Sequence, residues 1–239
     1  MNRLLKEIQF FRGQEHNMKV LLLTNMIYAF VLPVVEIFAG AYVMRTTNDP
    51  AMVAYYQLAM YVGVVVTSLV NGFLLKLLDI KTLYAAGILV SGISLGSMML
   101  IEHLGIIELG LTGCLLGAAS GFFWTNRYLL ALYNTSDGNR NYYFGLESFF
   151  FSVANITVPL IIGAFIGGMT GQEVLGITFN ANLCYRAVMA VVVAITLFAV
   201  SILWRGKFIM PTDTSFIHFR FHLLWRKMLA LSVLKGMVH

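Results

Sequence analysis

Residues 19–44 read KVLLLTNMIYAFVLPVVEIFAGAYVM, an apolar stretch whose single acidic residue, Glu36, lies beyond its centre. About 20 consecutive apolar residues form a helix that crosses the hydrocarbon core of a bilayer. A cleavable signal peptide has an apolar region of only roughly 7–15 residues. The longer run therefore predicts a first membrane-spanning helix at about Lys19–Met44 and places the chain among integral membrane proteins.

Further apolar runs of similar length follow along the chain. The sequence is 59% hydrophobic and only 11% charged, with a mean hydropathy of +0.80, whereas about 25% of residues are charged in ordinary soluble domains. The sequence predicts an all-α, polytopic membrane helix bundle of six transmembrane helices. The five later spans are expected at about Met52–Leu75, Thr82–Ile101, Ile106–Tyr133, Tyr142–Met169 and Leu183–Trp204.

The parts of the chain outside the apolar runs complete the predicted organisation. Residues 1–18 mix basic and apolar side chains, which indicates a cytoplasmic amphipathic segment on the membrane surface. Residues 19–205 form the six-helix bundle, and residues 206–226 form a cytoplasmic linker. The final apolar run, 227–239, is too short to span a bilayer. We expect it to be the start of a truncated seventh helix, with a short interfacial helix as the alternative.

The distribution of Lys and Arg predicts the orientation. If the N-terminus, the 76–81 loop, the 134–141 loop and the stretch after Trp204 share one side, that side carries nearly all basic residues near the spans. The other side holds only Arg45 and Arg186. The positive-inside rule therefore predicts a multi-pass cell-membrane protein with a cytoplasmic N-terminus. Because the net charge of +5 is explained by topology, no nucleic-acid partner is expected.

Two stretches resemble a known family. Residues 139–145, NRNYYFG, lead into residues 155–163, NITVPLIIG. Together with six spans and a basic linker, they resemble the basic loop 4–5 and the Gly/Pro-rich fifth-helix motif of major facilitator superfamily transporters. The 2–3 loop differs from the family pattern, because Lys76 stands where the family has an Asp. The resemblance covers about residues 19–239 and implies the N-terminal half of a twelve-helix transporter whose C-terminal six-helix half is missing here.

Glu36 is the first candidate for a solute or proton pathway. An ionised carboxylate inside a span costs on the order of a few kcal/mol unless it meets water or a partner. Asn25, Tyr28, Leu32 and Glu36 recur at helical spacing, which predicts one shared face. In the resembled family, the first helix lines the central cavity. The alternatives for Glu36 are a structural pair or a position near the outer headgroups.

A second group of candidates lies on the fourth span. Arg127 is one helical turn beyond Trp124 and seven residues from Ser120, so the three share a face. An Arg at this depth needs an acidic partner or an anionic ligand. Glu147 on the fifth span has a similar depth and could form a charge pair with Arg127. Ligand binding is the alternative, and snorkelling of Arg127 to the inner surface is a third.

Other patterns in the spans indicate helix packing. Amides within spans, such as Asn71 and Asn126, are expected to join helices by hydrogen bonds. Small residues four apart permit close helix approach, and they occur as three runs: Gly113-x3-Gly117-x3-Gly121, Gly92-x3-Gly96 and Gly163-x3-Gly167.

Signatures of catalysis are missing from the sequence. It contains no zinc-protease, nucleophile-elbow or Walker A motif, so we expect no enzyme activity, cofactor or metal site. The predicted function is secondary active transport of a small solute by alternating access, coupled to an ion gradient, in a protein surrounded by membrane lipid. The alternative is a non-transport membrane protein, such as an assembly factor or the permease subunit of an ATP-driven complex.

Overall fold

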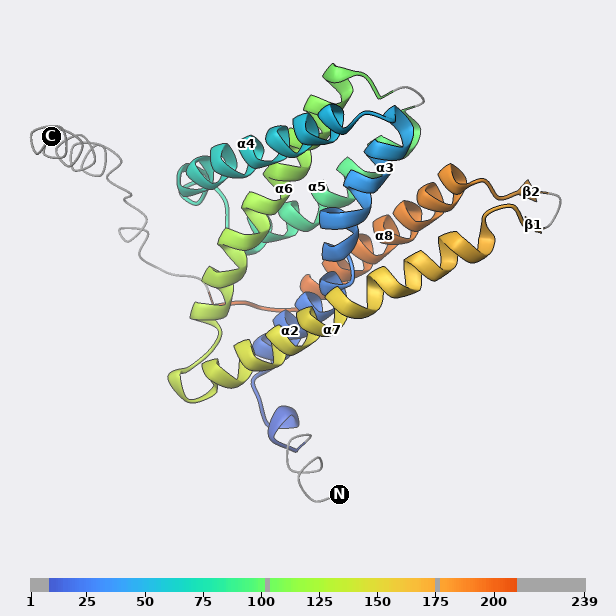
Figure 1. Cartoon of the computed structure of the whole chain (residues 1–239). Coiled ribbons are helices and arrows are strands. Elements are labelled where there is room, and N and C mark those ends of the chain that lie inside the picture. Colours follow the sequence, from blue (N-terminus) through green and yellow to red (C-terminus); the bar gives the residue numbers. More distant parts are fainter. Residues whose placement is uncertain (1–8, 102–103, 175–176, 210–239) are drawn as a thin grey trace, which may run out of the picture.

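The protein is a bundle of six long apolar helices, which suggests a multi-pass membrane protein (Figure 1). The computed structural model describes residues 9–101, 104–174 and 177–209. The predicted amphipathic segment 1–18 lies partly outside the described residues, as does the linker 206–226, and the predicted helix start 227–239 lies wholly outside them. Six segments are long and apolar enough to cross a membrane and are called crossings below: His16–Thr47, Pro50–Leu74 (α4), Ile80–Leu100 (α5), Ile106–Tyr133 (α6), Asp137–Met169 (α7) and Ala181–Leu203 (α8).

The observed helix bounds agree with the predicted spans to within a few residues, except at the start of α7. The sequence predicts a polar loop over 134–141, but α7 already begins at Asp137. The backbone N–H of Ser136 donates to Oδ1 of Asn139 at 2.8 Å, which satisfies a donor that the first helical turn would otherwise leave free. Between α7 and α8, a two-stranded antiparallel turn pairs β1 (Glu173–Val174) with β2 (Ile177–Thr178).

The first crossing is broken in its middle. Helix α2 (His16–Ala29) ends before Pro33, a π-helical turn η1 follows at Val34–Phe38, and α3 continues over Ala39–Thr47. Proline has no N–H and cannot continue the regular hydrogen-bond ladder, which explains the break. The prediction of one regular helical face is therefore wrong. Glu36 is exposed, whereas Asn25 and Tyr28 are buried in the core.

Helices α4 and α6 form the closest seam in the bundle. They cross in Figure 1, and glycines occupy the crossing. A Cβ added to Gly113 would lie 2.8 Å from the carbonyl oxygen of Tyr56, and one added to Gly117 would collide with the carbonyl oxygen of Met60. The predicted role of this glycine run in close approach is confirmed. In contrast, a Cβ at Gly163 or Gly167 would meet nothing within 4 Å in the described part of the chain.

One end of the bundle, called the basic end below, carries Lys76, Lys81, Arg140 and Arg205. The segment that follows α8 runs across this end. Lys81 donates to the carbonyl oxygen of Gly206 at 2.7 Å. Asn17 exchanges two hydrogen bonds with the backbone of Lys207, and Asn134 accepts from the N–H of Ile209 at 2.9 Å. These contacts place the ends of α2, α5, α6 and α8 together.

Candidate functional site

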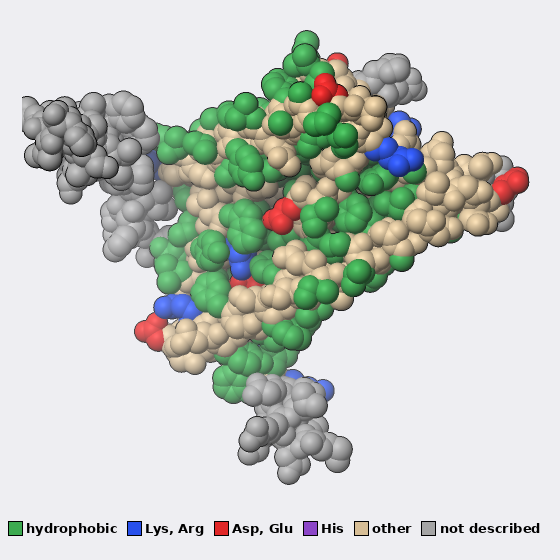
Figure 2. Space-filling view, viewed as in Figure 1, with side chains coloured by type: hydrophobic (Ala, Val, Ile, Leu, Met, Phe, Trp, Pro, Cys, Tyr) green, Lys and Arg blue, Asp and Glu red, His purple; other side chains and the backbone are tan. Residues whose placement is uncertain are grey.

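A recess of about 370 Å³ opens between the broken first crossing, α4 and α6. Its volume falls at the small end of the range for small-molecule sites, roughly 300–1,000 Å³. Figure 2 shows charged side chains in the middle of a face that is otherwise largely apolar. The side chains and glycine that line the recess are Leu32, Val35, Glu36 and Gly40 from the first crossing, Tyr56, Gln57, Met60, Tyr61 and Val64 from α4, and Ser120 and Trp124 from α6.

Glu36 is the charged group of this recess. It lies in η1, where the π-helical turn shifts it relative to the preceding helix α2. Its carboxylate is exposed and has no hydrogen-bond or ion-pair partner among the residues that the structure describes. π-Helical turns inside helices are frequent at functional sites. Because an ionised carboxylate in hydrocarbon is costly, ionised Glu36 requires contact with water, with a ligand or with another part of the protein.

Aromatic side chains form much of the recess wall. Tyr56 is almost fully buried, and its hydroxyl lies 3.8 Å from Sδ of Met98. Tyr61, five residues further along α4, is 63% exposed. Trp124 projects from α6, and Gln57 and Ser120 supply uncharged polar groups. The recess therefore combines one carboxylate with three aromatic rings.

A separate polar network lies deeper in the bundle, toward the basic end. Arg127 on α6 forms an ion pair with Glu147 on α7, with Nε 2.8 Å from Oε1 and Nη2 bound to Oε2. Both are buried, at 4% and 1% exposure. The fork of the guanidinium matches the two carboxylate oxygens, the arrangement that makes Arg the usual partner in buried pairs. The charge pair that the sequence left open is present in the structure.

Side chains from two further helices complete this network. Asn25 on α2 donates to Oε1 of Glu147 and to the hydroxyl of Tyr143, the latter at 2.7 Å. Tyr143 donates to Oε1 of Glu147 at 3.2 Å. Tyr84 on α5 donates to Oδ1 of Asn25. Four helices are thus joined around one buried carboxylate, and every oxygen of that carboxylate is satisfied.

Arg127 also contacts Trp124, a residue that lines the recess. Its guanidinium carbon lies 4.8 Å from the ring centre of Trp124, 4.9 Å from that of Tyr128 and 4.6 Å from that of Phe151. Nη1 has no hydrogen-bond partner in the described residues. The aromatic rings take the place of that partner, since a guanidinium binds favourably over an aromatic face.

The predicted site residues therefore divide into two groups. Glu36 and Trp124 line the recess, whereas Asn25 and Arg127 belong to the buried network. Tyr28 belongs to neither, because it donates to Oγ of Ser91 at 3.0 Å within the core. The amides of Asn71 and Asn126 bind each other between α4 and α6, as the sequence predicted.

Sequence reasoning missed several participants. It did not rank Tyr56, Gln57 or Tyr61 for the recess, and it did not place Tyr84 or Tyr143 in the network. The available signal was that Tyr84 and Tyr143 each lie in the first turn of a predicted span, and that Tyr143 precedes Glu147 by one helical turn. No group of three or more His, Cys, Asp or Glu side chains that could hold a metal ion occurs in the described ranges.

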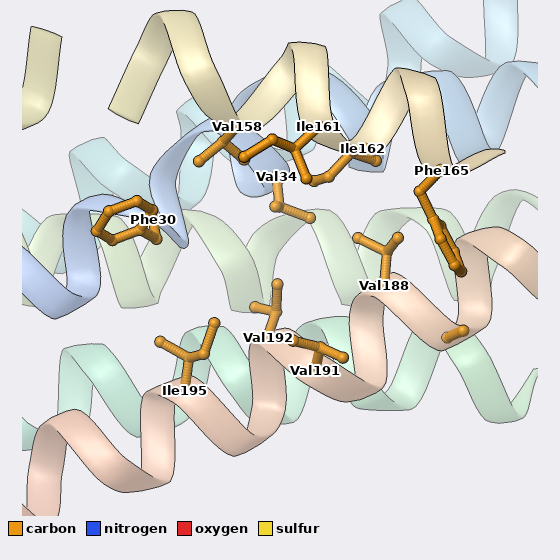
Figure 3. Close-up of a pocket in the computed structure, with 11 residues that line it drawn as sticks. Phe30, Val34, Val158, Ile161, Ile162, Phe165, Val188, Val191, Val192 and Ile195 are labelled. Carbon is orange, nitrogen blue, oxygen red and sulfur yellow. The ribbon is translucent and has the colours of Figure 1, made fainter. Parts of the chain in front are cut away.

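A second cavity of about 340 Å³ lies between the first crossing, α7 and α8. Figure 3 shows Val158, Ile162 and Phe165 of α7 pointing toward Val188 and Val192 of α8, with Val34 between them. The lining residues that the structure describes are all apolar. This cavity offers no chemistry beyond contact with other apolar groups, and Glu36 is not among its lining residues.

The comparisons with known proteins add little to this geometry. The sequence matches no protein-family model. It is similar to a Geobacillus stearothermophilus protein described as an uncharacterized protein in sodM 3'region. The two are 27% identical over 174 residues, which is 72% of this chain and 80% of that protein.

Proposed function

We propose that this chain is the N-terminal six-helix half of a secondary transporter of the major facilitator type. It moves a small solute across the cell membrane by alternating access, driven by an ion gradient, and the recess at Glu36 is the solute site. The observation that carries the proposal is the exposed carboxylate of Glu36, which has no partner among the described residues and lies at a break inside a membrane-length helix. Broken helices that bind solute near the midplane are characteristic of secondary transporters.

The position of the recess supports a second half of the protein. An ionised side chain that faced lipid would cost several kcal/mol, so this face is expected to lie against a water-filled cavity or another protein part. In the proposed arrangement, a C-terminal six-helix half covers the recess and forms the other wall of the solute pathway. The basic end then faces the cytoplasm, as the excess of Lys and Arg predicts.

Labelling from the two sides of the membrane tests alternating access without knowledge of the solute. We expect Tyr61→Cys, in a background with Cys114 and Cys184 replaced by Ala, to react with a membrane-impermeant maleimide from either side of oriented vesicles. Val66→Cys on the same helix is 53% exposed but does not line the recess, so it should stay unlabelled in lipid. Labelling of Tyr61→Cys from one side only would contradict alternating access and favour a static membrane protein.

The DNA downstream of His239 provides an independent test. Six further apolar spans in the same reading frame would support the transporter. A stop codon followed by an ATPase gene would instead support the permease subunit of an ATP-driven complex. Uptake by the full-length protein should also fall when Glu36 is replaced by Gln.

A further inference from the structure

We propose that the solute is an organic cation that binds between the Glu36 carboxylate and the aromatic wall of the recess. This inference rests on the proposed function and specifies the solute class of the same site. The first argument is the charge balance. Among the described residues that line the recess, Glu36 is the only charged one. Arg127, which lies against the recess residue Trp124, is already neutralised by Glu147, so the described lining of the recess has a net negative charge.

The aromatic wall is the second argument. Tyr56, Tyr61 and Trp124 surround the recess, and the negative face of an aromatic ring attracts a cation. The bundle already uses this interaction next to the recess, where Trp124 and two other rings enclose the guanidinium of Arg127. An anionic solute would find no cation among the described lining residues and would be repelled by Glu36. The chemistry therefore favours a positively charged solute with an apolar body.

The composition of the recess also separates an organic cation from a metal ion. Hard cations such as Ca²⁺ require about six to eight oxygen ligands, and Mg²⁺ requires an octahedral shell. The recess offers one carboxylate, the amide of Gln57, the hydroxyl of Ser120 and two Tyr hydroxyls, and the hydroxyl of Tyr56 already contacts Met98. Most of its remaining lining is aliphatic or aromatic, and a volume of about 370 Å³ suits a small organic molecule.

Binding to the detergent-solubilised, full-length protein tests the proposal. The probe is radiolabelled N-methyl-4-phenylpyridinium, measured by equilibrium dialysis, and the competitor is biphenyl-4-carboxylate, an anion of similar shape. We expect saturable binding of the cation and no competition by the anion. Glu36→Gln should weaken binding at least tenfold, because it removes the charge and keeps the shape of the side chain. Glu173→Gln, which removes a carboxylate from β1 outside the recess, is the matched control and should bind as the unmodified protein does.

The aromatic contribution has its own pair of variants. Tyr61→Leu should weaken binding about threefold to tenfold, and Tyr61→Phe, which keeps the ring, should bind within about twofold of the unmodified protein. Absence of saturable cation binding, competition by the anion, or equal binding by Glu36→Gln would overturn the cation class. A monodisperse gel-filtration profile for each variant confirms that it is folded.

The outcomes separate this inference from the proposed function. If Tyr61→Cys is labelled from both sides but no cation binds, the protein is a transporter for another solute class. If the cation binds through Glu36 but labelling occurs from one side only, the cation site stands without alternating access. Failure of both experiments would remove both proposals.

Discussion

The ion pair of Arg127 and Glu147 and the single carboxylate of Glu36 differ in how their charges are satisfied. Arg127 and Glu147 are buried, paired through two hydrogen bonds and supported by Asn25 and Tyr143. Glu36 is exposed in a recess and has no partner among the described residues. A satisfied buried network holds helices in register, whereas an unsatisfied exposed charge is available to a ligand. The buried network therefore stabilises the bundle, and the recess is the region available for binding.

Breaking the ion pair should cause the largest loss of stability in either region. Glu147→Ala leaves the Arg127 guanidinium buried without its counter-charge, and we expect a loss of about 3–5 kcal/mol of stability. The measurement is the thermal unfolding midpoint in detergent. The matched control is the double variant Arg127→Met with Glu147→Leu, which removes both charges and should recover most of the loss. Equal destabilisation by the single and double variants would contradict a structural pair.

A smaller effect should follow from removal of Asn25. This side chain is 0% exposed and links α2 to groups on α5 and α7. Asn25→Ala leaves the hydroxyl of Tyr84 without its acceptor, and we expect a loss of about 1–3 kcal/mol. The same unfolding measurement applies. Asn155→Ala, which removes an exposed amide from α7, serves as the control and should change stability by less than about 0.5 kcal/mol.

The smallest effect on stability should come from Glu36→Gln. The carboxylate contributes no ion pair among the described residues, so its neutralisation should change the free energy of unfolding by less than about 0.5 kcal/mol. The expected result is an unchanged unfolding midpoint together with a loss of solute transport. A drop in the midpoint comparable to that of Glu147→Ala would place Glu36 among the structural groups and remove the distinction between the two regions.

The sequence was sufficient to predict the six crossings. In a bilayer each backbone polar group must be satisfied within its own helix, so an apolar run of sufficient length has essentially one solution. It also allowed the Arg127–Glu147 pair, because two opposite charges at matching depth on consecutive spans can meet across a helix hairpin. The crossings depend on the length of each apolar run, and the ion pair depends on the depth of each charged residue within its span. Both can be read from the order of residues along the chain.

The recess could not be predicted as fully, because it depends on helix rotation and on long-range packing. The α4 residues Gln57 and Tyr61 line it only because the glycines of α6 bring that helix close to α4. The break at Pro33 rotates Glu36 away from the face that Asn25 occupies. Hydropathy does not specify either rotation, since apolar residues surround these helices on most sides. The predicted residues were therefore divided between the recess and the buried network, except Tyr28, which belongs to neither.

The glycine seam between α4 and α6 also has a practical use for studies of motion. Close backbone contact along the seam, together with the hydrogen bonds between Asn71 and Asn126 across it, favours movement of α4 and α6 as a single rigid element. Spin labels at Val62 on α4 and Leu111 on α6, both exposed, would then report one distance in every state of the protein. That constant distance provides a fixed reference for measuring the movement of any other helix.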